Sequence, residues 1–525
     1  MTDTEIPRDF QTEALELLRV YTGDVNARFH QDQLETIYQL VERKERVLLV
    51  QRTGWGKSAV YFIATKLLRR RNSGPTLLVS PLLALMRDQI RGASSILNAE
   101  TINSTNTDDW DIVEERALTD EIDILLISPE RLANNSFREN LLPVLSRRVG
   151  LFVVDEAHCI SNWGHDFRPD YQRIRNITSV LPAVVPLLAC TATANQRVID
   201  DVKEVMNIDT TIRGPLERKG LKLHAYKLDD PSERLAWLTR NIPFFNGAGI
   251  IYVLTIKDSN LVAEWLRDSG ITAEHYSANL PDEQRVRIEN DLLNNRVQVV
   301  VATTALGMGF DHPSLKFVIH YQSPQSVIHY YQQVGRAGRQ LNDSYGILLK
   351  GTEDDDINNY FIENAFPSEE DIRLVLGYIE ERGHWVTRNE ILSEINISPR
   401  SLEKVLLHLE IQQAIERRVG EYRRTLNPWN YDALTVEEIT SIRRAEVTEM
   451  KDYIETDECR NAFLLRALDD PNPAECGICQ NCTGRDLDLI NDHVEIERAQ
   501  SFVRSDYGII SPRLQEVPPE LRSSE

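Results

Sequence analysis

The sequence has no apolar run long enough to cross a membrane. Its hydrophobic stretches fall short of the roughly 18 consecutive residues that indicate a spanning helix, and the N-terminal MTDTEIPRDF is acidic rather than signal-like. We therefore expect a cytoplasmic protein. Positive charge is also scarce, with 59 Lys and Arg against 81 Asp and Glu, a net charge of −22. This balance argues against adhesion to nucleic acid over the whole surface but allows a local basic groove.

Cysteine is scarce too, with six in 525 residues. Cys159 and Cys190 stand alone beside apolar strands, so we interpret them as small buried hydrophobic residues. Four others cluster, three of them in the run CGICQNC. In an intracellular chain disulfides are disfavoured, and four thiolates around Zn²⁺ is the favoured interpretation; a redox CxxC pair or free thiols are the alternatives. The predicted zinc ligands are Cys459, Cys476, Cys479 and Cys482.

A length of 525 residues predicts about three to four domains. Near the N-terminus, RVLLV is typical of a buried strand, and it leads through QRTGWGKS into a helical pattern. Glycines let backbone N–H groups approach phosphates, Lys57 can reach the β and γ oxygens, and Ser58 can ligate Mg²⁺. Gln51 replaces the usual first glycine, and a Gly-rich turn with a chance lysine is the alternative. The predicted nucleotide-binding residues are Thr53, Gly54, Trp55, Gly56, Lys57 and Ser58.

A second buried strand, Leu151 to Val154, ends in Asp155 and Glu156, at the edge where open α/β sheets place ligands. One carboxylate can hold Mg²⁺ and the other can polarise water; a solvated helix start is the alternative. The run ISNWGHDFRPDY follows at once. Its aromatic and basic side chains can stack on bases or contact phosphate, and a buried aromatic turn is the alternative. These candidate DNA contacts are Trp163, His165, Phe167 and Arg168.

Units of strand, polar turn and helix recur over the first ~215 residues and predict a doubly wound parallel sheet. The pattern restarts at GIIYVL and continues through HYSANL, VQVVVATTALGMGFD and KFVIHY, which predicts a second sheet. It ends in YYQQVGRAGR, with Arg336 and Arg339 expected near a helix start. Arginines of a second lobe could neutralise a phosphoryl group held between the lobes. A solvated charge pair is the alternative.

Residues from Ser368 to Arg424 predict three helices and a hairpin that turns at Gly420 and Glu421, a winged-helix pattern. Ser398 is expected to cap the third helix before Pro399. A mild basic excess slightly favours DNA binding over a structural spacer. The residues of the hairpin that we expect to bind DNA are Arg417, Arg418, Arg423 and Arg424.

These motifs together resemble the RecQ-type DNA helicases of superfamily 2. The resemblance covers residues 26–350 in the family's motif order, through the P-loop, DEAH, TATA, ATTALGMGFDHP and QQVGRAGR, and the cysteine cluster extends it to about residue 485. The aromatic run after DEAH is what separates this family from other DEAH-box proteins. The resemblance implies an α/β fold of two tandem RecA-like parallel-sheet lobes, followed by a winged-helix-like unit and a small helical zinc-binding domain. The expected domains are lobe 1 over 1–215, lobe 2 over 216–350, the winged-helix-like domain over 366–428, the zinc-binding domain over 429–490 and an extended or disordered tail over 491–525.

The resemblance also implies roles. Asp155 and Ser58 would hold Mg²⁺, Glu156 would position the attacking water, His158 would relay nucleotide state, and Arg339 would be the arginine finger. The implied catalytic residues are Lys57, Asp155, Glu156, His158, Gln332, Arg336 and Arg339, and the implied nucleotide contacts also include Gln33, Gly309 and Asp311.

The chain departs from the family pattern in four places. His30 replaces the arginine expected before the adenine-binding Gln33, and Asn26 stands where the family tends to place an aromatic residue. About seventy residues precede the zinc region where the family has none. The stretch after Cys482 is too short for the family's usual winged helix and small helical domain. We expect it to be an extended or disordered end, and a linker to a further domain is the alternative.

We expect an ATP-dependent DNA helicase that moves 3′ to 5′ and uses ATP, Mg²⁺ and a structural Zn²⁺ in DNA repair or recombination. The alternatives are a DNA-stimulated ATPase that anneals or remodels without unwinding, and a zinc-stabilised DNA-binding scaffold with a vestigial ATPase. The resemblance implies a monomer at the bacterial nucleoid that acts on single-stranded and tailed or forked DNA, with single-strand-binding or repair proteins as candidate partners. RNA stays open.

Overall fold

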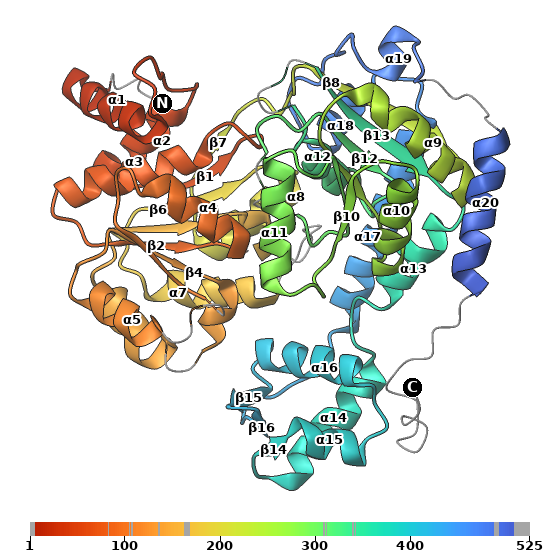
Figure 1. Cartoon of the computed structure of the whole chain (residues 1–525). Helices are drawn as coiled ribbons and strands as arrows, with labels where there is room; N and C mark the ends of the chain where they lie inside the picture. The colour runs from red at the N-terminus through yellow and green to blue at the C-terminus, as the bar shows by residue number, and fades with distance from the viewer. Residues whose placement is uncertain are drawn as a thin grey trace.

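The chain folds into two α/β lobes that lie side by side, with a smaller unit beneath them (Figure 1). Lobe 1 runs from red to yellow in the figure, lobe 2 is mainly green, and the smaller unit is cyan. The computed structural model describes residues 6–81, 83–103, 106, 109–134, 137–161, 169–307, 310, 312–338, 341, 343–487 and 493–508.

Lobe 1 is built on a seven-stranded sheet, in the order β3-β4-β2-β5-β6-β1-β7, whose neighbouring strands are parallel. Its strands are β1 (Arg46–Val50), β2 (Thr76–Val79), β3 (Ala99–Ile102), β4 (Ile124–Ile127), β5 (Leu151–Val154), β6 (Leu187–Thr191) and β7 (Thr210–Arg213). Continuous apolar strands favour burial on both faces. Leu48 and Val50 of β1 accordingly pack in the core on one face, and Val47 and Leu49 in the core on the other.

Helices cover both faces of this sheet, as the repeated units predict. They are α1 (Arg8–Thr22), α2 (Gln33–Tyr38), α3 (Lys57–Arg70), α4 (Leu83–Ala93), α5 (Trp110–Leu118), α6 (Leu142–Leu145), α7 (Ile174–Val180) and α8 (Gln196–Met206). Local sequence sets their ends. The Asn195 side chain, for example, accepts a hydrogen bond from the backbone N–H of Val198 and so caps α8.

Lobe 2 contains a six-stranded parallel sheet in the order β10-β11-β9-β12-β13-β8. The strands are β8 (Leu221–Lys227), β9 (Gly249–Tyr252), β10 (Ala273–Tyr276), β11 (Val299–Ala302), β12 (Phe317–His320) and β13 (Ser344–Lys350). The helices are α9 (Pro231–Phe245), α10 (Ile256–Asp268), α11 (Asp282–Leu293), α12 (Val327–Val334) and α13 (Asp354–Glu363). The prediction of a second parallel sheet is therefore confirmed, and two of its strands, β8 and β13, were not anticipated.

The winged-helix unit, residues 369–424, has its own hydrophobic core. Its elements are α14 (Glu369–Arg382), β14 (Val386–Thr387), α15 (Arg388–Glu394), α16 (Pro399–Ile411), β15 (Ile415–Arg418) and β16 (Glu421–Arg424). Ser398 caps α16 before Pro399, as expected. The hairpin turns one residue earlier than predicted, at Val419 and Gly420, because Arg418 pairs with Glu421 across the strands.

The cysteine unit, residues 433–487, completes one face of lobe 2. It contains α17 (Ala433–Glu455), α18 (Arg460–Ala467) and α19 (Gln480–Thr483). Buried side chains of α17 and α18 belong to the same core as strands β8, β9, β11 and β12. Tyr453, for example, lies with its ring centroid 5.1 Å from that of Tyr330 on α12. This unit therefore packs as part of lobe 2 rather than as a separate appendage.

The turn after α18 joins the cysteine unit to lobe 1. The Asp469 carboxylate accepts the backbone N–H of Gln196 at the start of α8, at 2.8 Å. Asp470 accepts the backbone N–H of Leu216, between the lobes, at 2.9 Å. Asp469 has a φ of 54°, a left-handed conformation that costs energy outside glycine and that such fixed contacts maintain.

The predicted extended or disordered tail is wrong for residues 493–508, which form the helix α20 (His493–Gly508) along α9 (Figure 1). Ala499 is fully buried in the lobe 2 core, and the Phe502 ring centroid lies 5.3 Å from that of Trp265. The helix is stable because its apolar residues pack on lobe 2, a contact that the polar local composition does not reveal.

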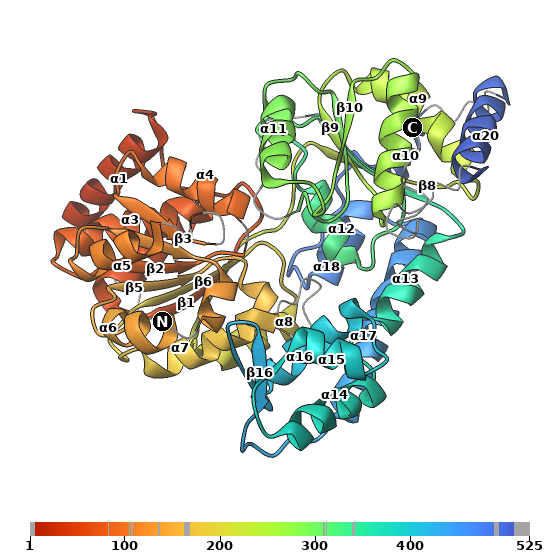
Figure 2. The ribbon, with the colours of Figure 1, turned by 60° about the horizontal axis from the view of Figure 1, so that its bottom comes forward.

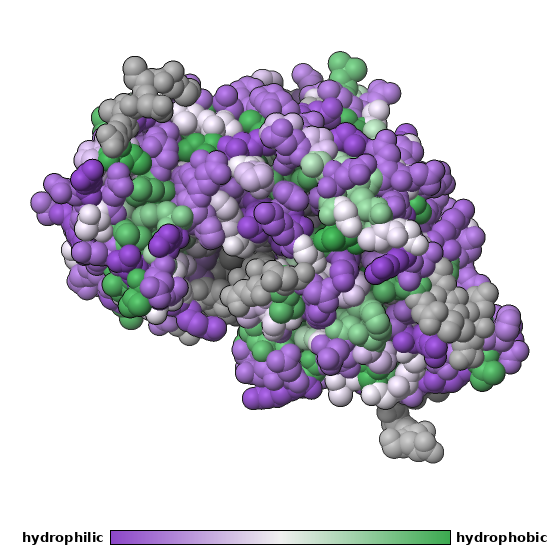
Figure 3. All heavy atoms as spheres, turned by 90° about the horizontal axis from the view of Figure 1, so that it is seen from above, coloured by the Kyte–Doolittle hydropathy of each residue, from purple (hydrophilic) through white to green (hydrophobic). Residues whose placement is uncertain are grey.

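Within the described residues, no helix is both long and apolar enough to span a membrane. On the face in Figure 3, hydrophilic residues predominate and hydrophobic ones occur in small separate groups. Scattered apolar exposure of this kind is ordinary for protein surfaces.

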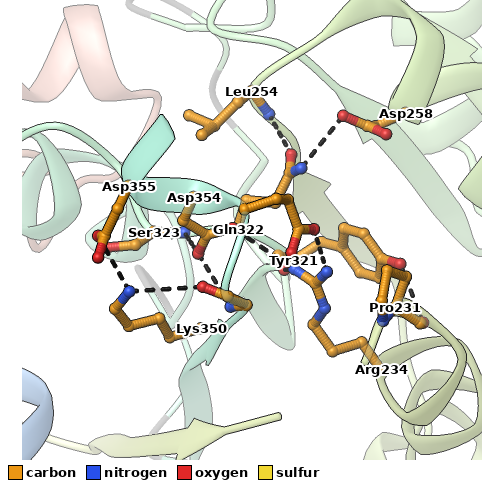
Figure 4. Close-up of polar contacts among 12 residues, drawn as sticks. Pro231, Arg234, Leu254, Asp258, Tyr321, Gln322, Ser323, Lys350, Asp354 and Asp355 are labelled. Atoms are coloured by element: carbon orange, nitrogen blue, oxygen red, sulfur yellow. Dashed lines mark hydrogen bonds and ion pairs between the residues drawn. The ribbon is translucent and has the colours of Figure 1, made fainter. Parts of the chain in front are cut away.

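A buried polar network fixes the point where lobe 2 leads into α13 (Figure 4). The fully buried Arg234 donates to the Tyr321 carbonyl at 2.9 Å and pairs with Asp354 at 3.5 Å. Asp354 also accepts the backbone N–H of Ser323 at 2.7 Å. Burial raises the pKa of Asp354 to about 7, against the lowering effects of the Ser323 N–H and Arg234.

Replacing Arg234 with methionine is expected to destabilise the protein by about 3–5 kcal/mol, because the Asp354 carboxylate would stay buried without its cationic partner. Since burial raises the folded-state pKa of Asp354, its contribution to stability is complete below the unfolded pKa and is lost as pH rises through about 7. Arg234 favours the ionised form of Asp354, and this form predominates in the wild type only above about pH 7. The loss of stability in R234M, measured by thermal unfolding, should therefore be larger at pH 8 than at pH 6. The exposed Arg240 on the same helix supplies the control, with R240M expected to change stability by less than about 0.5 kcal/mol.

Candidate active site and metal centre

The P-loop follows β1 and includes the first two residues of α3. Gly54 and Gly56 have φ values of 80° and 94°, which only glycine adopts without strain. A Cβ on Gly56 would also lie 2.7 Å from the Gln33 amide nitrogen. The Lys57 ammonium donates to the Gln51 carbonyl at 2.9 Å, so the lysine lies across the loop.

Gln33, the predicted adenine contact, supports the P-loop backbone in this structure. Its amide nitrogen donates to the carbonyls of Trp55 at 3.1 Å and Gly56 at 3.2 Å, and its amide oxygen accepts the backbone N–H of His30 at 2.8 Å. The Trp55 side chain is buried in the lobe 1 core. Both residues therefore shape the loop, whatever further contact Gln33 makes.

A hydrogen-bonded chain links the P-loop serine to the acidic box. The Tyr61 hydroxyl donates to the Ser58 hydroxyl at 2.9 Å, and the Gln89 amide donates to the Tyr61 oxygen at 2.9 Å and to the Asp155 carboxylate at 2.7 Å. Burial raises the pKa of Asp155, and Lys57 opposes that shift. Nothing in the sequence around Gln89 and Tyr61 marked them, because the bonds that Gln89 makes to Tyr61 and to Asp155 join positions 28 and 66 residues apart.

The acidic box also contacts the TATA segment. Glu156 has a φ of 48°, a strained left-handed conformation. Its carboxylate lies 3.4 Å from the Nδ1 atom of His158, and that atom lies 3.0 Å from the Thr191 hydroxyl. Thr191 in turn donates to the carbonyl of Thr193 at 3.1 Å. The box is thereby connected to the end of β6 and to the segment that leads into α8.

On the lobe 2 side, Gln332 lies in α12 and Arg336 follows its end; both are buried. The expected position of Arg336 near a helix start is wrong, because Ser326 caps α12 and the helix closes at Gly335. Arg336 donates to the Phe310 carbonyl at 3.2 Å. The other predicted lobe 2 residues, Gly309, Asp311 and Arg339, lie outside the described part of the chain.

Arg218, which no motif marked, joins the two lobes at the P-loop. It lies between β7 and β8, and its guanidinium donates to the Thr53 carbonyl at 3.0 Å. A Cβ added to Gly335 would come within 3.0 Å of the same guanidinium. Arg218 therefore lies between the predicted phosphate loop of lobe 1 and the end of α12 in lobe 2.

The four predicted DNA contacts of the aromatic run, Trp163, His165, Phe167 and Arg168, lie outside the described residues. The chain is described again from the 3₁₀ turn η6 (Pro169–Arg173). In η6, the fully buried Tyr171 donates its hydroxyl to the carbonyl of Asp155 at 3.1 Å. The end of the aromatic run is therefore anchored to the acidic box.

The predicted arginines of the hairpin divide into two kinds. Arg424 donates to the carbonyls of Ala414 at 2.7 Å and Asn427 at 2.9 Å, contacts that close the base of the hairpin. Arg418 and Arg423 lie over the Trp385 ring, at 4.3 Å and 4.7 Å. Arg417 lies 5.9 Å from the ring centroid of Tyr422. Arg424 is thus a structural residue, and the other three stay predicted DNA contacts.

The four clustered cysteines converge on one point. Their sulfur atoms all lie within 4.8 Å of one another, and the Cys459 sulfur is 3.6 Å from Cys476 and 4.0 Å from Cys479. Tetrahedral Zn²⁺ with bonds of about 2.3 Å separates its sulfur ligands by about 3.8 Å, so the donors fit zinc. Within the cluster, the Cys476 thiol lowers the pKa of Cys479, whereas the hydrogen bond to Cys479 raises the pKa of Cys476 and burial raises that of Cys482. The predicted zinc site is confirmed.

Solved structures with a similar fold include the DEAD-box helicase Mss116p bound to single-stranded RNA and AMP-PNP, with a TM-score of 0.58 and 15% identity over 90% of this chain and 92% of that one. A second is the helicase MrfA bound to DNA, with a TM-score of 0.56 and 16% identity over 81% of this chain and 60% of that one. At this level of identity the likeness concerns the two-lobe fold alone.

Three family models match the chain: DEAD/DEAH box helicase over residues 30–202, helicase conserved C-terminal domain over 235–340 and RecQ zinc-binding over 425–483. The chain is 30% identical to the ATP-dependent DNA helicase RecQ of Bacillus subtilis, over 90% of this chain and 67% of that protein. It is 31% identical to the probable ATP-dependent DNA helicase RecS of the same species, over 73% of this chain and 77% of that protein. It spans about half, 51%, of the RecQ helicase of Haemophilus influenzae, at 34% identity over 61% of this chain. The chain therefore belongs to the RecQ-type family of ATP-dependent DNA helicases.

Proposed function

We propose that this chain hydrolyses ATP with Mg²⁺ to move 3′ to 5′ along single-stranded DNA and to separate the strands of a duplex. The observation that carries the proposal is the hydrogen-bonded chain from Ser58 through Tyr61 and Gln89 to Asp155. It brings the P-loop and the acidic box to one edge of the lobe 1 sheet. The Arg218 contact with Thr53 supports a nucleotide site that responds to lobe 2.

The donor set at this edge fits Mg²⁺, a cation that prefers hydroxyl, carboxylate and water oxygens. Ser58 and Asp155 would hold the ion, since Tyr61 and Gln89 already orient both side chains toward the same network. When bound, Mg²⁺ neutralises charge on the β and γ phosphates.

The side chains around this edge have separable roles in the proposal. Lys57 would exchange its bond to the Gln51 carbonyl for phosphate oxygens. Glu156, oriented by His158, would position water for attack. Arg339 would act as the finger, and the remaining lobe 2 residues of the site would support it: Gln332, Arg336, Gly309 and Asp311.

DNA would bind first to the aromatic run. Trp163 and Phe167 are suited to stack on bases whatever their sequence, and His165 and Arg168 are suited to contact phosphate. Arg417, Arg418 and Arg423 of the hairpin would add contacts to the duplex of a tailed or forked substrate. We propose a monomer that acts in DNA repair or recombination.

Replacing Lys57 with alanine is expected to lower ATP turnover by about 100-fold or more, because water cannot replace a fixed charge on the transferring phosphate. Turnover is measured with and without single-stranded DNA, and the wild type should be stimulated by DNA. Lys66→Ala, near the other end of α3, should leave both rates unchanged. Undiminished hydrolysis in K57A would contradict the assigned phosphate site, and a wild type without turnover would indicate a vestigial ATPase.

Strand displacement on duplexes with a 3′ or a 5′ single-stranded tail tests direction and unwinding. A motor that moves 3′ to 5′ loads on the 3′ tail, so displacement should be several-fold faster there. Hydrolysis stimulated by DNA without displacement on either tail would instead favour an annealing or remodelling enzyme.

Replacing Cys479 with serine should reduce bound zinc below one per chain and lower the thermal midpoint, because loss of one thiolate weakens metal-coupled folding. The core that α18 shares with lobe 2 makes the loss of stability extend into that lobe. Metal content by mass spectrometry and thermal unfolding provide the readouts. Cys190→Ala removes a buried thiol away from the cluster and should retain one zinc per chain.

A further inference from the structure

The winged-helix unit contacts lobe 1 through η6, against which the end of α16 packs. There the Arg173 guanidinium lies 2.9 Å from the Glu410 carboxylate, with the two side chains only 9% and 12% exposed. Figure 2 shows the unit lying beside lobe 1 as well as below lobe 2. The inserted unit is therefore docked on the motor rather than suspended from it.

This ion pair differs from the other charged contacts of the same helix. Arg388 and Glu403, for example, form a pair whose side chains are 38% and 60% exposed. Exposed pairs contribute little, because water and salt screen them. A largely buried pair holds its geometry more firmly, and loss of one partner leaves a desolvated charge.

Within η6, Arg173 contacts the winged-helix unit, and Tyr171, two residues earlier, contacts the acidic box. Arg173 is held by Asp170 at 3.1 Å on one side and by Glu410 on the other. Two residues before Arg173, the buried Tyr171 donates to the Asp155 carbonyl. A displacement of α16 would therefore reach the backbone of the metal-binding aspartate through one short, packed turn.

We infer that Arg173 and Glu410 are positioning residues that couple the inserted winged-helix unit to ATP hydrolysis through η6. DNA held by the winged-helix unit shifts α16, η6 follows through the buried pair, and Tyr171 transmits the shift to Asp155. The inference rests on the proposed function, since it requires hydrolysis that DNA stimulates. It also gives the inserted unit a role that a passive spacer would not have.

The test uses the full chain with E410Q, R173Q and the double variant, and measures ATP turnover with and without saturating single-stranded DNA. We expect basal turnover within about twofold of wild type. DNA-stimulated kcat should fall about three- to tenfold, the size of effect seen for residues along coupling networks. The KM for ATP should change little. The double variant should be no worse than either single one, because both remove the same contact.

E403Q removes a carboxylate from the exposed pair on the same helix and serves as the matched control, with stimulation equal to wild type. Equal stimulation in E410Q and wild type would overturn the inference. Basal and stimulated rates that fall together would also overturn it, because that pattern indicates damage to lobe 1 rather than lost coupling. A wild type that DNA fails to stimulate would refute the proposed function and the inference with it, whatever the variants do.

Discussion

The burial of one carboxylate, that of Asp155, is the constraint on which the active edge of lobe 1 depends. Its desolvation is costly, and the fold offsets that cost with the Lys57 charge, the Gln89 amide and the backbone N–H of Glu156. Each of these partners comes from a different segment. The buried carboxylate is therefore stabilised only when the P-loop, α4 and the DEAH turn are all in place, so its position depends on all three segments.

Further contacts connect lobe 1 to lobe 2 and to the cysteine unit. Lobe 2 reaches the P-loop through Arg218, and the cysteine unit reaches lobe 1 and the link between the lobes through Asp469 and Asp470. Zinc at the four cysteines would therefore stabilise more than the cysteine cluster itself. The cysteine unit shares a core with lobe 2 and also contacts α8, which begins just after the TATA segment, so it contributes to the relative placement of the two lobes.

The winged-helix unit illustrates how a domain with its own core is held against the two helicase lobes. Its own core would let it fold as a separate unit, and α13 and α17 join it to lobe 2. What commits it to lobe 1 is the contact of α16 with η6, with Glu410 against Arg173. In a helix-turn-helix protein, the helix that corresponds to α16 lies in DNA. Here lobe 1 covers the C-terminal end of α16. The predicted DNA contacts of the unit are therefore those of the hairpin, namely Arg417, Arg418 and Arg423.

The sequence by itself determined the two parallel sheets, the winged-helix pattern and the four zinc ligands, because periodic apolar strands, helix caps and short cysteine spacings are local signals. Tertiary structure alone decided the contacts of Gln89 with Asp155, Arg218 with Thr53 and Arg173 with Glu410. These join residues far apart in the chain, and neither composition nor periodicity encodes such partners. Helix α20 follows the same rule: its local sequence is mostly polar, and only packing on α9 and Trp265 makes the helix favourable.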